Sequence, residues 1–282
     1  MLGLILSLLL QTAPIPDSVI VEAPQSEAQR HPASPDMSSI IARIRLALDA
    51  GRYDQADALL QQHHDPLASS YRDDMTVLQA EVMLAKGDPH GAEQAVAAVG
   101  PEGRFRCQVL LIRGMAAHAR GDADRSVTQL GTLTNECSVT WRVWDVLGQL
   151  MAGLGEQDAS RFAFQRALAS QDCPASVSAH YGHSLIQFGS LDEASAMLAK
   201  ALVQDPANNA AQRDQDYLVG LRGFEPERRD REGDTDWARR LADAADGARH
   251  AGRSDLARAL YAQALLASPQ YDARLLEAAS EP

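Results

Sequence analysis

Apolar residues recur along most of the chain at spacings of three and four, in pairs of stretches separated by short polar segments. The segment 175–206 shows the pattern most clearly: Tyr181, Leu185 and Phe188 fall on one helical face, and Gly189 marks a turn. After the turn, a second face is formed by Ala194, Leu198, Ala201 and Leu202. Such spacings are typical of amphipathic helices. The pattern therefore predicts two antiparallel helices per unit, each with one face to bury.

Glycines mark the turns at nearly constant intervals. They occur at 51, 87, 121, 155, 189, 223 and 252, so four successive intervals are 34 residues long. A glycine just past a helix end adopts the left-handed conformation at the least cost. Six of these glycines are followed, five positions later, by a small residue that lets two helices approach closely: Ala56, Ala92, Ser126, Ser160, Ala194 and Ala257. A single hairpin cannot bury its apolar face, so we expect the repeated hairpins to stack.

Further residues recur at fixed positions within the units. Segment 175–206 carries Tyr181-Gly182, Leu185, Gly189, Leu191, Ala194, Leu198, Ala201-Leu202 and Pro206, and the preceding unit carries Trp144, Leu147-Gly148, Gly155, Phe164 and Ala167-Leu168. On these residues the sequence resembles the tetratricopeptide repeat family over about residues 37–270. The resemblance implies an all-α, right-handed superhelical solenoid of about six hairpins. Its repeat-defining positions here are Gly51, Ala56, Gly87, Ala92, Gly114, Gly121, Trp144, Gly148, Gly155, Gly182, Gly189, Ala194, Pro206, Gly252 and Ala257.

The chain divides into five segments by composition. Residues 2–10 form an apolar run of nine, shorter than the roughly 20 that span a bilayer. It fits a secretory signal, so 1–23 is predicted as a leader, the alternative being an apolar terminus that packs on the domain. The remaining segments are a Pro-rich linker at 24–36, the array at 37–223, a charged insertion or hinge at 224–234 that breaks the array, and a terminal unit with a capping helix at 235–282.

Composition narrows the class of protein. The 26 basic and 38 acidic side chains give a net charge of -12, which argues against a protein that coats nucleic acid. A hydrophobic share of 45% excludes a disordered chain. Aromatic residues make up only 5% of the sequence, which fits closely packed helices better than a β-sandwich.

Three cysteines are present: Cys107, Cys137 and Cys173. No CxxC motif or Cys/His cluster accompanies them, so no zinc or other metal site is expected. One interpretation is three small buried residues. If the protein is exported, Cys107 and Cys137 are the expected disulfide, because a helical hairpin brings the two ends of its unit to one side.

No catalytic constellation is visible in the sequence. The GxGxxG, GxxxxGK[ST], HExxH and GxSxG motifs are absent, and no cofactor is expected. His180 and His183 share a helical face at metal-like spacing, but we interpret them as polar positions on a helix that lines a groove.

The resemblance also indicates which surface meets a partner, because the first helix of each unit lines the concave side in this family. The positions transferred to this chain are Asp74, Val77, Glu81, Leu84, Gln108, Leu111, Met115, His118, Arg142, Asp145, Gln149, His183, Ile186 and Gln187. Their mixture of apolar and polar side chains suits an extended or helical peptide. The Lys and Asn residues with which some of these proteins clamp a C-terminal carboxylate are missing from these positions.

The leading hypothesis is a non-enzymatic scaffold that binds a protein or peptide in a bacterial cell envelope, in assembly of a pilus, secretion or outer-membrane system. The alternative is a cytoplasmic adaptor or regulator. An enzyme is the third hypothesis, and it lacks a visible site.

Overall fold

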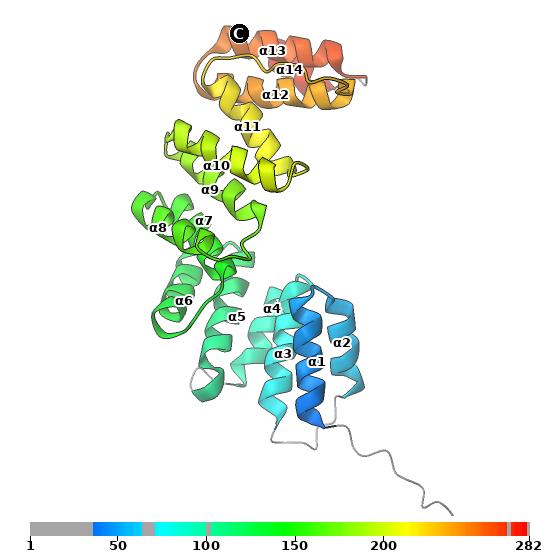
Figure 1. The fold of residues 1–282 in the computed structure, drawn as a ribbon, viewed down its shortest axis with the longest axis vertical. Coiled ribbons are helices and arrows are strands. Elements are labelled where there is room, and N and C mark those ends of the chain that lie inside the picture. The colour runs from blue at the N-terminus through cyan, green and yellow to red at the C-terminus, as the bar shows by residue number, and fades with distance from the viewer. Residues whose placement is uncertain (1–35, 64–70, 100–102, 270–271, 281–282) are drawn as a thin grey trace, which may run out of the picture.

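The computed structural model describes residues 36–63, 71–99, 103–269 and 272–280. Within these ranges every regular element is a helix, which confirms the predicted all-α class. Figure 1 shows the helices stacked along the long axis of the molecule, with α1–α4 at one end and α12–α14 at the other. The predicted leader and nearly all of the Pro-rich linker lie outside the described residues. No described helix is long and apolar enough to cross a bilayer.

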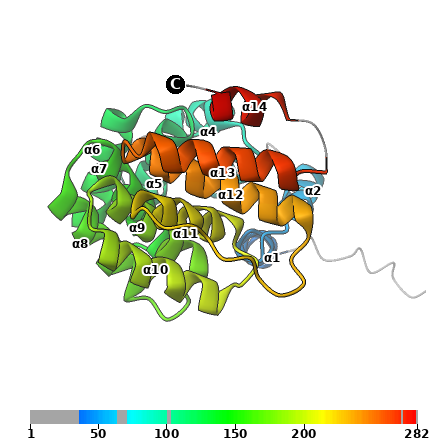
Figure 2. The same cartoon turned by 90° about the horizontal axis from the view of Figure 1, so that it is seen from above.

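Five helical hairpins form the first and longer part of the array. They pair α1 (Met37–Asp49) with α2 (Tyr53–Gln62), α3 (Arg72–Ala85) with α4 (Pro89–Ala97), α5 (Arg106–Ala119) with α6 (Ala123–Glu136), α7 (Trp141–Gly153) with α8 (Gln157–Leu168), and α9 (Ala175–Gln187) with α10 (Leu191–Gln204). A single 3-10 turn, η2 (Gly103–Phe105), precedes α5. Seen along the long axis in Figure 2, α6, α8 and α10 lie at the outer edge, and α5, α9 and α11 lie nearer the middle.

The first helix of every hairpin ends in the same way. The glycine after α9, Gly189, has φ +71°, and the amide of Ser190 donates to the carbonyl of Leu185 across 2.9 Å. This six-to-one bond defines a Schellman motif, which satisfies a carbonyl that the helix itself leaves open. The same geometry recurs after α1, α3, α5, α7, α11 and α12. The glycine spacing in the sequence is thus the spacing of helix ends.

Small residues set the distance between the two helices of a hairpin. A Cβ atom placed on Gly148 of α7 would lie 2.8 Å from the ring of Phe164 on α8, and one on Gly182 would lie 2.8 Å from Leu198. Ser160, which stands where the repeat usually has Ala, donates a 2.8 Å hydrogen bond to the carbonyl of Gly148. Ser126 bonds Gly114 in the same way. The hydroxyl therefore fits the crossing because a carbonyl of the facing helix satisfies it.

The core is divided along the array. One cluster is shared by four helices and includes Phe164 of α8, Tyr181 of α9, Leu198 of α10 and Leu218 of α11. Phe164 and Tyr181 stack with their ring centroids 5.0 Å apart. Each further cluster likewise joins helices that are neighbours in sequence. No hairpin buries its apolar face alone, as expected for a solenoid.

The C-terminal part departs from this regular pattern. Helix α11 (Asn209–Leu221) is followed by a long loop, then by α12 (Asp234–His250), α13 (Ser254–Ala267) and α14 (Ala273–Ser280). Helices α11 and α12 touch backbone to backbone, since a Cβ atom on Gly220 would clash with the carbonyl of Ala244 and one on Gly247 with that of Tyr217. Helix α14 packs on α13 through Leu275, Ala278 and Ala279.

The charged segment 224–234 is held against α11 and α12 by a buried ion network. The guanidinium of Arg240 bonds Asp216 of α11 at 2.9–3.0 Å and reaches Glu232 of the loop at 3.1 Å. It also donates to the carbonyl of Glu227. The three charged side chains are 2–8% exposed. The loop thus closes onto the α11–α12 pair, and its last residue, Asp234, already belongs to α12.

Candidate partner-binding face

The predicted groove residues lie on the first helices α3, α5, α7 and α9, and most of them are half-buried or exposed. Val77 is an error of the prediction: it is fully buried in the cluster that α3 shares with α4 and α5. Its place in the helix turns it inward, so it cannot meet a partner. Asp145 is also buried, with its side chain 9% exposed. Leu111 and Met115 are partly buried against the cluster of α5–α8.

At the middle of the array the structure brings groove residues of three helices together. His180 of α9 places Nδ1 3.0 Å from both carboxylate oxygens of Asp145 on α7. The amide of Gln149 lies 3.2 Å from Asp145 and 3.1 Å from His180. Asp145 also acts electrostatically on His118 of α5, whose pKa burial lowers. The buried carboxylate is thus compensated by Gln149 of its own helix and by His180 of the neighbouring helix.

A second Asp–His pair follows at the next helix junction. His183 of α9 places Nδ1 3.0 Å from Asp214 of α11, and this hydrogen bond raises the pKa of the imidazole. Gln187 approaches the other ring nitrogen at 3.3 Å. The two histidines that share a helical face in the sequence therefore turn to opposite neighbours, His180 to α7 and His183 to α11. Within the described residues, no group of three His, Cys, Asp or Glu side chains is arranged to hold a metal ion.

The register of the repeat explains where these ionisable residues come from. The position nine residues before each turn glycine holds Leu78, Ile112 and Val146 in α3, α5 and α7, all buried. In α9, α11 and α12 the same position holds His180, Asp214 and Asp243. This repeat position therefore changes from buried apolar residues in α3, α5 and α7 to ionisable residues in α9, α11 and α12. The groove prediction stopped at Gln187 and missed the residues of α11 and α12; reading this column along the repeat would have found them.

A half-open pocket of about 800 Å³ lies between α9, α11 and α12. We call it the C-terminal pocket. Helix α9 contributes three of the predicted groove residues, His183, Ile186 and Gln187. Helices α11 and α12 contribute a mixed wall that includes Asp214, Tyr217, Leu221, Asp243 and Asp246. A pocket of this size, partly apolar with a few polar groups, has the dimensions of a binding site for a peptide segment or small ligand, about 300–1,000 Å³.

Asp243 stands out among the carboxylates of this pocket. Its side chain is 16% exposed, and Arg239, one turn earlier on α12, places a single nitrogen 3.4 Å from it. Burial raises the pKa of Asp243 to about 6, and the nearby carboxylates Asp216 and Asp246 add to the shift. A carboxylate held in this way is compensated only in part when it is ionised.

The opposite end of the concave side is less organised. Asp74 of α3 pairs with Arg104 at 2.5 Å, and Arg104 also lies over the ring of Phe105. The side-chain oxygen of Gln108 on α5 is buried without a hydrogen-bond partner in the described part of the chain. None of these residues lines the C-terminal pocket.

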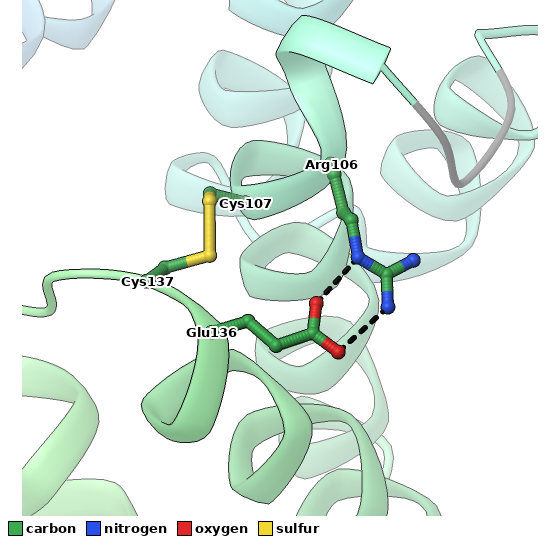
Figure 3. The surroundings of a disulfide bond; sticks show 4 residues. All are labelled: Arg106, Cys107, Glu136 and Cys137. Carbon is green, nitrogen blue, oxygen red and sulfur yellow. Dashed lines mark hydrogen bonds and ion pairs between the residues drawn. A yellow bond between two sulfur atoms is a disulfide. The ribbon is translucent and has the colours of Figure 1, made fainter.

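The third unit is closed covalently. Cys107, the second residue of α5, forms a disulfide with Cys137, the residue that ends α6, and their Cα atoms are 6.0 Å apart. Figure 3 shows Arg106 and Glu136 beside the disulfide, joined by two hydrogen bonds of 2.5 and 2.8 Å. Cys173 remains a free thiol. The two ends of one hairpin are thus joined at the same side, the pairing that the sequence indicates for an exported protein.

Solved structures that are similar to this chain include the following two. One belongs to the APC/C hetero-tetramer Cut9-Hcn1, with a TM-score of 0.59 and 12% identity over 89% of this chain and 50% of that chain. The other is a tetratricopeptide repeat protein from Parabacteroides merdae, with a TM-score of 0.51 and 12% identity over 86% of this chain and 96% of that chain. The chain thus spans about half the length of the Cut9-Hcn1 chain. No protein-family model and no curated protein matches the sequence. These likenesses establish the fold: the chain is a helical solenoid of the tetratricopeptide repeat type.

Proposed function

We propose that this protein is a non-enzymatic scaffold that binds a peptide segment of a protein partner along its concave side, in the cell envelope of a bacterium. The fold supports the coarse part of this proposal, because stacked hairpins create an extended concave surface. The observation that carries the site is the C-terminal pocket, where three predicted groove residues of α9 meet ionisable and apolar side chains of α11 and α12.

Export is the part of the proposal that rests on two independent features. Residues 2–10 have the length and apolarity of a signal segment. The disulfide Cys107–Cys137 is of a kind that persists outside the reducing cytosol. The roles in pilus, secretion or outer-membrane assembly remain narrower versions of this proposal, and the partner distinguishes them.

The partner site is tested by site-specific photo-crosslinking in cells. A photoreactive residue at Gln187, exposed on α9 at the pocket, should give a discrete adduct with one partner. The matched control is Val203 on α10, which is 83% exposed on a second helix. Equal labelling at both positions, or none at Gln187, would contradict a groove that binds the partner.

The compartment is tested by fusing the full chain to a reporter that is active only outside the cytoplasm. The fusion should be active, and deletion of residues 2–10 should abolish its activity. In parallel, a maleimide reagent added to denatured, unreduced protein should modify Cys173 alone and, after reduction, all three cysteines. Full modification before reduction, together with an inactive fusion, would favour the cytoplasmic adaptor.

A further inference from the structure

The C-terminal pocket has a chemical character that points to one class of side chain. Its carboxylates, Asp214, Asp243 and Asp246, face two guanidinium groups, Arg213 and Arg249. The wall between them is apolar and aromatic, with Ile186 of α9 and Tyr217 of α11. These charged groups differ in how many hydrogen bonds and ion pairs they already make.

Two of the three carboxylates are already compensated from several sides. Asp214 accepts a hydrogen bond from His183 at 3.0 Å and lies 3.7 Å from the guanidinium of Arg213. Asp246 accepts from the hydroxyl of Tyr261 at 2.6 Å and from Arg249 at 2.8 Å. Arg249 is therefore engaged by Asp246, and Arg213 lies beside Asp214, so each arginine of the pocket has an acidic neighbour.

Asp243 is the exception. Arg239 is its only ion-pair partner among the described residues, through one long contact of 3.4 Å, and Arg239 also lies 3.6 Å from Asp236. A half-buried carboxylate has already lost part of its hydration on folding. A cation that binds it therefore gains electrostatic attraction and a charge-assisted hydrogen bond at a small further cost in desolvation of the carboxylate. The raised pKa of Asp243, about 6, agrees with a negative charge that the surrounding residues compensate only in part.

We propose that the C-terminal pocket binds a lysine or arginine side chain of the partner, with Asp243 as its principal acceptor and Ile186, Tyr217 and Leu221 against its methylene stem. Long basic side chains lay their stems on apolar surface and direct the charge to a polar site. This inference names the partner's chemistry at the proposed groove, and so rests on the proposed function.

The experiment uses the full-length, oxidised protein and an array of random peptides whose ends are capped to remove the terminal charges. The wild-type protein should select peptides with Lys or Arg at one fixed position. For a selected arginine peptide, replacing that arginine by citrulline, which has the same shape without the charge, should weaken binding about tenfold or more. Selection of an acidic or apolar residue at the fixed position would overturn the inference.

The contact is assigned to Asp243 by a double-mutant cycle with Asp243→Asn. In that variant, arginine and citrulline peptides should bind with nearly equal affinity. The control Asp255→Asn removes the same charge from α13, where the side chain is 96% exposed, and should keep the wild-type preference. Melting curves of both variants verify folding. A charge preference that survives Asp243→Asn would overturn the assignment.

Dependence on pH gives a second readout. Affinity for the arginine peptide should rise as the pH increases through about 6, because Asp243 must be ionised to accept the cation. Arg239 and Asp246 on α12 and Arg213 and Asp216 on α11 act electrostatically on this group, and His183, Asp214, Arg249 and His250 line the same pocket. The part due to Asp243 is therefore the difference between wild type and Asp243→Asn. No difference between the two profiles would count against the inference.

The outcomes separate the inference from the proposed function. If peptides bind the pocket without a preference for Lys or Arg, the proposal of a peptide-binding groove stands and the inference of a basic side chain is wrong. Selection of no peptide by any variant would count against both.

Discussion

At the scale of single residues, one position of the repeat holds a glycine in some units and a buried carboxylate in another. Seven residues before the turn glycine stand Gly114, Gly148 and Gly182, each against a side chain of the second helix. In α11 the same position holds Asp216, which is 1% exposed and bound to Arg240. A carboxylate is tolerated there because a guanidinium from α12 takes the space that a second-helix side chain fills elsewhere.

The glycine at this position can be tested against a glycine that has free space. Gly148→Ala should lower the stability by about 1–2 kcal/mol, because its new methyl group meets the fully buried ring of Phe164. Gly131→Ala on α6, where no atom lies within 4 Å, should raise stability by about 0.5–1 kcal/mol through helix propensity alone. Urea unfolding measures both. Similar shifts in the same direction would contradict the close crossing.

Asp243 should make stability depend on pH. Its pKa is raised from 3.8 to about 6 in the folded protein, so the folded state binds a proton more readily than the unfolded state between these values. Stability contributed by this group therefore increases as the pH falls through about 6. Asp243→Asn should be more stable than wild type by about 1–2 kcal/mol at pH 7.5, since partial solvent access limits the effect. Thermal melting across pH should show this gain shrinking below pH 6; a constant difference would refute the shift.

At the scale of elements, hairpins are closed by different means along the chain. The α5–α6 hairpin has a disulfide between its ends, the α7–α8 and α9–α10 hairpins rely on packing at Gly148 and Gly182, and the α11–α12 pair has a buried ion network. Each of these contacts is sensitive to a different change. A reductant breaks the disulfide, a larger side chain disrupts the glycine crossings, and the loss of one charge disrupts the ion network.

Reducing the disulfide should loosen the α5–α6 hairpin. Cys137→Ser should lower stability by about 2–4 kcal/mol, because the unfolded chain regains the freedom of a loop that spans a sequence separation of 30. Cys173→Ser is the matched control, since that thiol is free, and should have little effect. The denaturation midpoint with and without reductant measures the difference. A midpoint of the wild type that is insensitive to reductant would contradict this role.

The ion network should be costly to break from one side. Arg240→Met leaves Asp216 and Glu232 buried without their cation, and the expected loss is about 3–5 kcal/mol. Arg258→Met on α13 removes an arginine whose ion pair with Asp255 is exposed, and should cost less than about 1 kcal/mol. Thermal melting compares the two variants. Equal effects would show that the loop is not held by Arg240.

At the scale of the whole molecule, the solenoid restricts each helix to nearby neighbours. Figure 1 shows α1–α4 and α12–α14 at opposite ends, with the other hairpins between them, and the core clusters follow the same order. Stability in such an array is a sum of local terms rather than one cooperative core. The C-terminal pocket belongs to the far end, in the part of the array where the regular hairpin pattern stops.

Because each helix contacts only nearby helices, we expect a destabilising substitution to affect only the neighbouring part of the array. In Arg240→Met, hydrogen–deuterium exchange should accelerate in α11–α13 and remain unchanged in α1–α4, because no core cluster connects the two regions. Peptide-resolved exchange measured by mass spectrometry resolves the two ends. Acceleration of equal size along the whole chain would instead indicate a single cooperative unit.

The repeat could be predicted from the sequence alone. Turn glycines, small residues at the crossings and amphipathic spacing are local requirements of helix ends and helix pairs. They therefore recur along the sequence and can be recognised without coordinates. For the same reason the sequence indicated the disulfide: Cys107 and Cys137 stand at the two ends of one hairpin, which meet wherever the hairpin forms.

The contacts between residues of different units depend on how the hairpins pack in three dimensions. Whether Val77 faces the groove or the core depends on how α3 packs on α4 and α5. The partners of His180 and His183, separated by 35 and 31 residues from Asp145 and Asp214, depend on the rotation between successive hairpins. The pocket depends on the direct contact of α11 with α12, between which a loop stands where the other units have a second helix. These are properties of packing between elements, and the spacing of residues within one helix does not specify how that helix packs on its neighbours.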